Sequence, residues 1–192
     1  MEIFLVGYGT LLHRGSLDRS IGRESADRKR ILPVLVRGYR RLFNLRPTHY
    51  ATSFKLSREP IENAAMNVEP AAAERFNGLG FEATPEELAA LDERERYYRR
   101  KTAPVFHFDS GELIGEGHFY VSDPDASWIA RDVAKLMPLW RDVVWARAGA
   151  YRVGETFGRC YDETTYLADG RTLVIDRYRH VIDDVEGVDL PE

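Results

Sequence analysis

Residues 84–101 of the chain read TPEELAALDERERYYRRK, and this stretch opens as a helix should. Thr84 is suited to cap the helix N-terminus, Pro85 fits the first turn, and Glu87 completes a capping box. At about 100° per residue, one side of this helix collects three apolar or aromatic side chains and one carboxylate. These four residues are Leu88, Leu91, Glu95 and Tyr98.

Glu95 has two interpretations. A glutamate held against apolar neighbours resists ionisation, and its raised pKa suits proton transfer near neutral pH. The alternative is an ordinary salt bridge with Arg99, four residues further on, at the charged edge of an amphipathic helix. Taken alone, the stretch favours the salt bridge, because such pairs are common on helices.

The N-terminus suggests a second feature. Residues 1–6 (MEIFLV) are typical of a strand, and they run into Gly7-Tyr8-Gly9-Thr10-Leu11. Two glycines that flank a tyrosine indicate a turn whose backbone comes close to another group. Successive N–H groups in such a turn can bind an anion, although a plain strand-to-loop turn is the simpler interpretation. The segment is not a phosphate loop, because it lacks the Lys-Ser/Thr pair of that motif.

Composition excludes several classes of function. The chain has 192 residues, is 44% hydrophobic and 11% aromatic, and so has material for a substantial core. Its net charge of −4 disfavours nucleic-acid binding. A single cysteine, Cys160, excludes an intramolecular disulfide and a multi-cysteine metal site. With no apolar run of membrane-spanning length and Glu2 in place of a basic signal sequence, we expect a cytoplasmic protein.

Strands are predicted through most of the first two thirds of the chain, and helices near its end. Gly38 indicates a bend or bulge in the strand at 31–44, and a loop is expected at 46–63. Two further strands, joined by a hairpin, are expected at 64–68 and 76–83. A second hairpin is expected at 103–108 and 113–121, and a short last strand at 172–175. A helical region is expected from about 123, with a further short helix within 151–166.

This order favours an α+β fold over alternating α/β. Many short strands around one inserted helix can close into a small mixed β-barrel, whose mouth is a natural ligand pocket. We expect the turn at Gly7 and the carboxylate of Glu95 to meet there. One domain is predicted over residues 1–182, with a helical C-terminal extension from about 123 and an acidic tail at 183–192.

The two features together resemble a known family. Val6-Gly7-Tyr8-Gly9-Thr10-Leu11, followed much later by Leu91-Asp92-Glu93-Arg94-Glu95 and Tyr98-Arg99, looks like the γ-glutamylcyclotransferase-like family. In that family, a Tyr-Gly-Ser/Thr loop pairs with a Leu-Asp-x-x-Glu segment. The resemblance spans roughly residues 3–121, and the C-terminal third matches no motif that carries chemistry.

The resemblance implies a mixed β-barrel with an inserted catalytic helix and flanking C-terminal helices. It also implies that a γ-glutamyl amide cyclises to 5-oxoproline and releases its amine, without a cofactor. Glu95 would be the acid/base, and the backbone of Tyr8, Gly9, Thr10 and Leu11 would hold the glutamyl part, with Tyr98 beside it. Held in a folded conformation, the substrate would undergo an intramolecular attack.

Substrate and activity stay open at this point. Thr10 stands where many members have serine, as in the branch that acts on γ-glutamylamines. In that branch, however, a glycine follows the loop more closely than Gly15 does here. The glycine often found after the glutamate is also absent. A non-catalytic ligand-binding or regulatory protein, or an enzyme for another amide, is the alternative. The expected partner is a small γ-glutamyl substrate; no metal, nucleic acid or membrane is expected, and a homodimer is left open.

Overall fold

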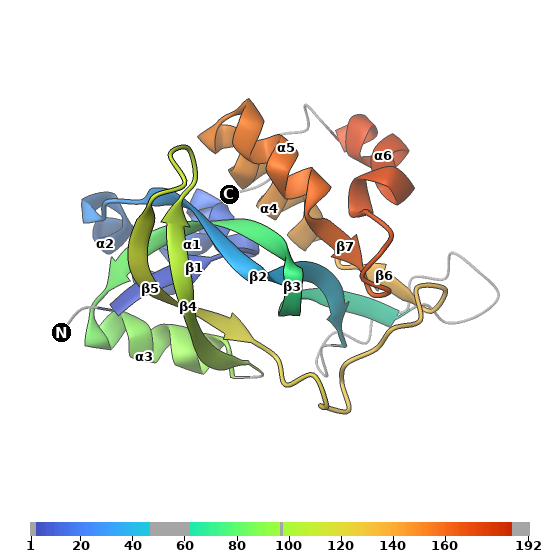
Figure 1. Cartoon of the computed structure of the whole chain (residues 1–192), viewed down its shortest axis with the longest axis horizontal. Coiled ribbons are helices and arrows are strands. Elements are labelled where there is room, and N and C mark those ends of the chain that lie inside the picture. The colour runs from blue at the N-terminus through green and yellow to red at the C-terminus, as the bar shows by residue number, and fades with distance from the viewer. Residues whose placement is uncertain (1–2, 47–61, 97, 186–192) are drawn as a thin grey trace.

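The computed structural model describes residues 3–46, 62–96 and 98–185. Five strands form its centre, and they pair in the order β3-β1-β5-β4-β2. A further pairing between β2 and β3 closes this sheet into a barrel, in which β1 and β5 are parallel and the other pairs are antiparallel. The five strands are β1 (Ile3–Gly7), β2 (Leu32–Leu45), β3 (Glu62–Ala83), β4 (Arg99–His107) and β5 (Leu113–Val121). The predicted mixed β-barrel is therefore confirmed (Figure 1).

β3 differs from its prediction. Instead of two strands joined by a hairpin, it is one strand of 22 residues that pairs with β2 along most of its length. The pairing shifts between Arg37 and Tyr39, where Gly38 has a φ of +84°, so the bend or bulge predicted at Gly38 coincides with an irregularity of the ladder. Across this shift the alanine-rich residues 71–74 have no partner in β2. The segment that favours a turn is thus accommodated as an irregularity of a continuous ladder.

The inserted helix is shorter than predicted. α3 (Pro85–Arg94) starts with the expected capping box, in which Thr84 Oγ1 accepts from the Glu87 N–H and Glu87 Oε2 accepts from the Thr84 N–H. It ends at Arg94 rather than near residue 101, and Glu95 is its C-cap residue. Arg99 already pairs with Val121, because β4 completes the ladder with β5 and this pairing outweighs the local helical pattern.

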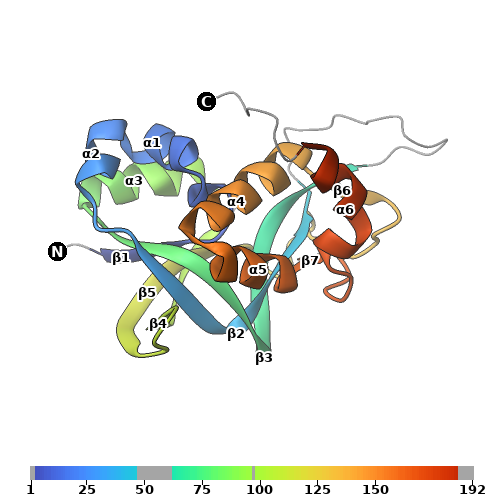
Figure 2. The same cartoon turned by 90° about the horizontal axis from the view of Figure 1, so that it is seen from above.

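Two helices from the N-terminal part accompany α3. α1 (Arg14–Ile21) and α2 (Arg23–Arg28) follow the loop after β1. Leu17 packs with Leu5, Leu88 and Leu91 in a small apolar core between α1, α3 and the barrel. Figure 2 shows these three helices gathered on one side of the molecule.

The C-terminal third contributes to both the sheet and the core. It contains β6 (Leu136–Pro138), α4 (Trp140–Val153), α5 (Glu155–Glu163), β7 (Thr165–Leu167) and α6 (Val174–Val185). β6 pairs with β3 and β7 with β2, both in parallel. Val143 and Ala146 of α4 and Phe157 of α5 belong to the main core together with Phe76 and Phe119 of the barrel. Figure 1 shows α4, α5 and α6 side by side, away from α3.

Several boundaries in this third correct the predictions. Residues 123–137 are not helical: Ile129 bridges to Leu45, and the Ala130 N–H donates to the Asn44 carbonyl. The backbone of this segment is therefore paired with the end of β2, and α4 starts only after Pro138. The predicted last strand at 172–175 is instead the start of α6, with one bridge from Leu173 to Tyr166. The predicted loop falls mostly, and the acidic tail partly, outside the described residues.

Candidate active site

A pocket of about 450 Å³ opens where the end of β1 meets α1, the end of α3 and α4. It brings together all six residues that the sequence singled out, because Tyr8, Gly9, Thr10, Leu11, Glu95 and Tyr98 all line it. The expectation that the glycine turn and Glu95 meet is therefore confirmed by their positions. The other lining residues are Val6, Gly7, Ser16, Arg19, Ser20, Ala65, Met66, Arg94, Tyr120, Arg141, Asp142 and Trp145.

The loop after β1 forms one wall of the pocket. A side chain at Gly7 would place its Cβ 2.7 Å from the Cβ of Leu11, so this turn requires glycine. The chain then enters a short 3-10 helix, η1 (Thr10–Leu12), in which the Leu12 N–H donates to the Gly9 carbonyl at 2.9 Å. The first N–H groups of a helix have no partner within it, so a loop of this shape can offer donors to an anion.

The side chain of Tyr8 is buried and belongs to the main core. Its hydroxyl donates to the Tyr120 carbonyl at 2.7 Å, and its ring packs edge-on against Phe76. Burial raises the pKa of Tyr8 well above its usual value, so the hydroxyl stays protonated. Tyr8 therefore anchors the loop through its side chain.

Glu95 lies at the end of α3, where the buried face formed by Leu88 and Leu91 reaches the pocket. Its N–H donates to the Leu91 carbonyl at 2.8 Å, and its side chain is 19% exposed. Burial raises the pKa of Glu95, the Arg94 guanidinium opposes that rise, and the Asp142 carboxylate adds to it. A carboxylate with a raised pKa is a stronger base, as the sequence suggested for this position.

The alternative ion pair with Arg99 does not form. Arg99 pairs with Asp123 at 3.2 Å, because α3 ends before it and Arg99 lies in β4. The cation beside Glu95 is Arg94, whose Nε lies 3.4 Å from Glu95 Oε1. The spacing of residues along a helix did not predict this contact, because it pairs residues three or four apart, whereas Arg94 and Glu95 are adjacent and lie where the helix ends.

Arg94 also ties the end of α3 to the other walls. Its guanidinium donates to Thr10 Oγ1 at 2.9 Å, to Ser16 Oγ at 3.4 Å and to the hydroxyl of Ser20. Thr10 belongs to the loop, and the two serines belong to α1. Arg94 thus links the loop, α1 and the end of α3 around Glu95.

Tyr98 closes the pocket on the side of β3. Its hydroxyl donates to the Met66 carbonyl at 2.7 Å. Burial raises the pKa of Tyr98 well above its usual value, and the neighbouring Tyr8 and Glu95 raise it further. A protonated tyrosine whose hydrogen is already engaged can still accept a hydrogen bond from a ligand.

α4 supplies three lining residues that the sequence did not identify: Arg141, Asp142 and Trp145. Burial raises the pKa of Asp142, while Arg141 and Arg94 lower it. Arg141 Nε lies 3.7 Å from Asp142 Oδ1. The adjacent opposite charges at the start of this helix look in sequence like an ordinary solvated surface.

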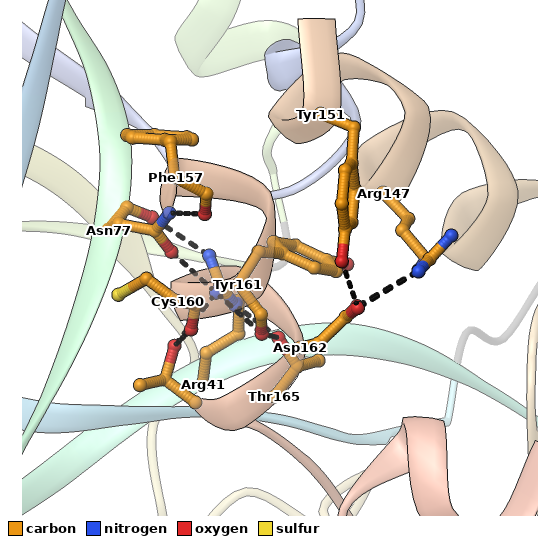
Figure 3. A network of polar contacts seen from close by, with 10 residues as sticks. Arg41, Asn77, Arg147, Tyr151, Phe157, Cys160, Tyr161, Asp162 and Thr165 are labelled. Atoms are coloured by element: carbon orange, nitrogen blue, oxygen red, sulfur yellow. Dashed lines mark hydrogen bonds and ion pairs between the residues drawn. The ribbon is translucent and has the colours of Figure 1, made fainter. Parts of the chain in front are cut away.

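A buried cation, Arg41, contacts the loop and belongs to the network of polar contacts drawn in Figure 3. Arg41 of β2 is fully buried, and its Nη1 donates to the Tyr8 carbonyl at 3.2 Å and to the Asn77 carbonyl at 2.8 Å. Its guanidinium carbon lies 4.1 Å from the centre of the Tyr161 ring. Its other bonds reach Thr165 Oγ1, Asn77 Oδ1, the Tyr161 carbonyl and Thr164 Oγ1.

Burial lowers the pKa of Arg41 to about 10, so it remains a cation at neutral pH. Its contacts join the loop carbonyl of Tyr8 to the end of α5. α5 is held in turn by Asp162, which pairs with Arg147 of α4 at 3.0 Å and accepts from the Tyr151 hydroxyl (Figure 3). The C-terminal third is therefore connected to the loop through the hydrogen bonds of Arg41.

Within the described residues, no cluster of three or more His, Cys, Asp or Glu side chains could hold a metal ion. A helix long and apolar enough to cross a membrane is likewise not found in this part of the chain.

Comparisons with known proteins bear on the fold. No family model and no curated protein match the sequence. A solved γ-glutamyl cyclotransferase is 11% identical, with a TM-score of 0.59 over 96% of this chain and 99% of that one. An uncharacterised protein from Homo sapiens is 12% identical, with a TM-score of 0.59 over 95% of this chain and 98% of that one.

A third similar structure is YkqA from Bacillus subtilis, which is 12% identical with a TM-score of 0.59. The similarity covers 100% of this chain and 56% of YkqA. At these identities the likeness establishes the fold, in agreement with the closed mixed barrel and its flanking helices. The chain therefore has the fold of the γ-glutamyl cyclotransferases.

Proposed function

We propose that the protein is a γ-glutamyl cyclotransferase, which converts a γ-glutamyl amide into 5-oxoproline and a free amine. The observation that carries this proposal is the meeting of Glu95 and the glycine loop in one pocket. Neither the loop alone nor a half-buried glutamate alone is specific to this activity. Placed together on this fold, they supply a base and a binding site for an anion, which the cyclisation needs.

The glutamyl part of the substrate is a zwitterion, and the pocket has groups for both of its charges. The backbone of Tyr8, Gly9, Thr10 and Leu11 would receive the α-carboxylate through its N–H groups. Arg94 adds a positive charge beside Thr10. The α-ammonium would then face Glu95, with Tyr98 forming the adjacent wall.

Two protons must leave the α-nitrogen, because the α-ammonium carries three hydrogens and the ring nitrogen of 5-oxoproline carries one. The Glu95 carboxylate takes a proton from the α-ammonium, which frees the lone pair of the amine. The amine nitrogen attacks the γ-carbonyl carbon, and a five-membered ring forms. The bond from that carbon to the leaving nitrogen then breaks, and Glu95 returns its proton to that nitrogen. Glu95 then takes a second proton, from the ring nitrogen, and passes it to the released amine. The products are 5-oxoproline and the amine as its ammonium ion, and Glu95 is again a carboxylate.

The structure suits Glu95 to both steps. A pKa raised by burial makes the carboxylate a better acceptor for an ammonium proton than an exposed glutamate would be. The intramolecular attack depends on holding the substrate folded, which the closed walls around the pocket favour. The cytoplasmic location stays a prediction, and a homodimer stays open.

The test is to incubate the purified protein with γ-glutamyl dipeptides, glutathione and γ-glutamyl-ε-lysine, and to identify products by mass spectrometry. We expect 5-oxoproline and the free amine in equal amounts from at least one compound. Release of glutamate would contradict the cyclisation, because water rather than the α-amine would then be the nucleophile. Saturable binding without any product would favour the non-catalytic alternative.

A further inference from the structure

The loop and Glu95 account for one half of the pocket under the proposed function, and the other half is lined by α1 and α4. The glutamyl part would lie between the loop and Glu95, so the amine part must extend along the remaining walls. Those walls present two arginines and one tryptophan, Arg19, Arg141 and Trp145. This half of the pocket therefore faces whatever the leaving amine carries.

The two arginines lie on the same indole. The guanidinium carbon of Arg19 is 4.8 Å from the centre of the Trp145 ring, and that of Arg141 is 5.2 Å from it. Attraction between a cation and an aromatic face holds each charge near the ring without using its N–H donors. Trp145 is itself stacked on His13, with the ring centres 5.5 Å apart. The site is thus a pair of cations placed on a supported aromatic platform.

The donors of these arginines are largely uncommitted. Among the described residues, Arg19 forms no ion pair, and the ion pair of Arg141 with Asp142 spans 3.7 Å. A guanidinium has five N–H donors in a planar fork that matches a carboxylate. Two such groups on one ring are suited to bind an anion between them.

The net charge of the whole pocket also favours a substrate with an additional carboxylate. Three guanidinium groups (Arg19, Arg94 and Arg141) and two carboxylates (Glu95 and Asp142) line it, which leaves one positive charge in excess. A γ-glutamyl derivative of a neutral α-amino acid carries two carboxylates and one ammonium at neutral pH, hence one net negative charge. A γ-glutamyl alkylamine and free γ-glutamyl-ε-lysine each carry no net charge. Only the first class complements the pocket.

We propose that Arg19, Arg141 and Trp145 form the subsite for the leaving amine, and that this subsite selects amines that carry a carboxylate. The substrates are then γ-glutamyl α-amino acids or peptides rather than γ-glutamylamines. This inference rests on the proposed function. It also gives the C-terminal third a role in specificity, since α4 supplies two of the three residues.

The experiment compares γ-glutamyl-L-alanine with γ-glutamyl-L-alaninamide, which differ only in the leaving-group carboxylate. The rate of 5-oxoproline release is measured for wild type, Arg19→Gln, Arg141→Gln and the double variant, with Arg152→Gln as control. Arg152 also lies on α4 but is exposed and does not line the pocket. Thermal unfolding of each variant checks that the exposed substitutions leave the fold intact.

We expect kcat/KM to favour γ-glutamyl-L-alanine by about tenfold in wild type and in Arg152→Gln, chiefly through KM. The preference falls to about twofold or less in the double variant, and added salt weakens it in wild type. Equal use of both compounds by wild type, or an unchanged preference in the double variant, would overturn the subsite while leaving the cyclotransferase intact. If no γ-glutamyl compound yields 5-oxoproline, the proposed function fails, and the inference fails with it.

Discussion

The two halves of the pocket are held in different ways. Around Glu95, the loop, α1 and β3 are joined by short hydrogen bonds, such as Arg94 to Thr10 at 2.9 Å and Tyr98 to the Met66 carbonyl at 2.7 Å. On α4, Arg141 is 54% exposed and its recorded polar partner, Asp142, lies 3.7 Å away. Groups that react must be held in place, whereas groups that recognise a variable amine can adapt.

This difference suggests that the two halves of the pocket have different functions. The closely bonded half would carry out the chemistry, and the exposed half would choose the leaving group. Arg41 adds to the difference between the two halves, because from the buried side of the loop it bonds the carbonyl of Tyr8 in the loop and that of Tyr161 in α5. Substitutions in the first half should therefore affect kcat or folding, and substitutions in the second half should affect selectivity or pH dependence.

The largest effect is expected from Glu95→Gln. The amide keeps the shape of the side chain but cannot accept the ammonium proton, so kcat should fall by about 10²–10⁴-fold. KM should change little, because the loop and the remaining walls are intact. Steady-state release of 5-oxoproline measures both values. Glu93→Gln is the matched control, since Glu93 lies on the same helix but is exposed and does not line the pocket. Near-normal turnover by Glu95→Gln would remove Glu95 from the reaction.

Arg41→Met should have the next largest effect, on stability. The substitution removes a buried donor from the Tyr8 and Asn77 carbonyls, and each buried group left unsatisfied costs about 1–3 kcal/mol. The Tyr161 carbonyl keeps its bonds from Thr164 and Thr165. We expect a loss of several kcal/mol in total, as for other disrupted buried polar networks. Urea denaturation followed by circular dichroism measures it.

Arg37→Met is the control on the same strand. Arg37 is exposed and lies over the Phe106 ring at 4.2 Å, so its replacement should change stability by about 1 kcal/mol or less. If both variants unfold at the same urea concentration, the buried network does not support the loop. Arg41→Lys keeps a positive charge without the planar fork, and we expect it to fall between wild type and Arg41→Met.

The half of the pocket to which we assign the chemistry is also the half that the sequence predicted. The capping box fixes where α3 begins, and the two glycines mark the loop, because both signals depend on neighbouring residues. Glu95 was identified through its position beside Leu88 and Leu91, and the buried face of α3 confirms that position. The family resemblance joined the two stretches, which local patterns alone could not do.

The other half depends on contacts between distant segments, which local patterns do not report. Arg41 looks like one more arginine in a strand, and its role follows from Thr165 and Tyr161, more than a hundred residues away. The end of α3 was misplaced because pairing between β4 and β5 outweighs helix propensity there. Arg141 and Asp142 resemble an ordinary surface pair until α4 is placed against the loop.

The smallest effect, and the sharpest link between the two halves, is expected from Asp142→Asn. The Asp142 carboxylate of α4 raises the pKa of Glu95, whereas Arg94 of α3 lowers it. Removing the negative charge of Asp142 should therefore lower the pKa of Glu95. Because Glu95 must be ionised to act as a base, the acid limb of kcat/KM against pH should move to lower pH.

At the optimum pH, the rate of Asp142→Asn should fall by about tenfold or less, because Glu95 then becomes a somewhat weaker base. Asp125→Asn is the control, since Asp125 is exposed and does not line the pocket, and its profile should overlay that of wild type. An acid limb that stays in place in Asp142→Asn would mean that α4 does not tune the base. A shifted limb with an unchanged preference for γ-glutamyl-L-alanine would show that one helix adjusts the chemistry through Asp142 and chooses the amine through Arg141.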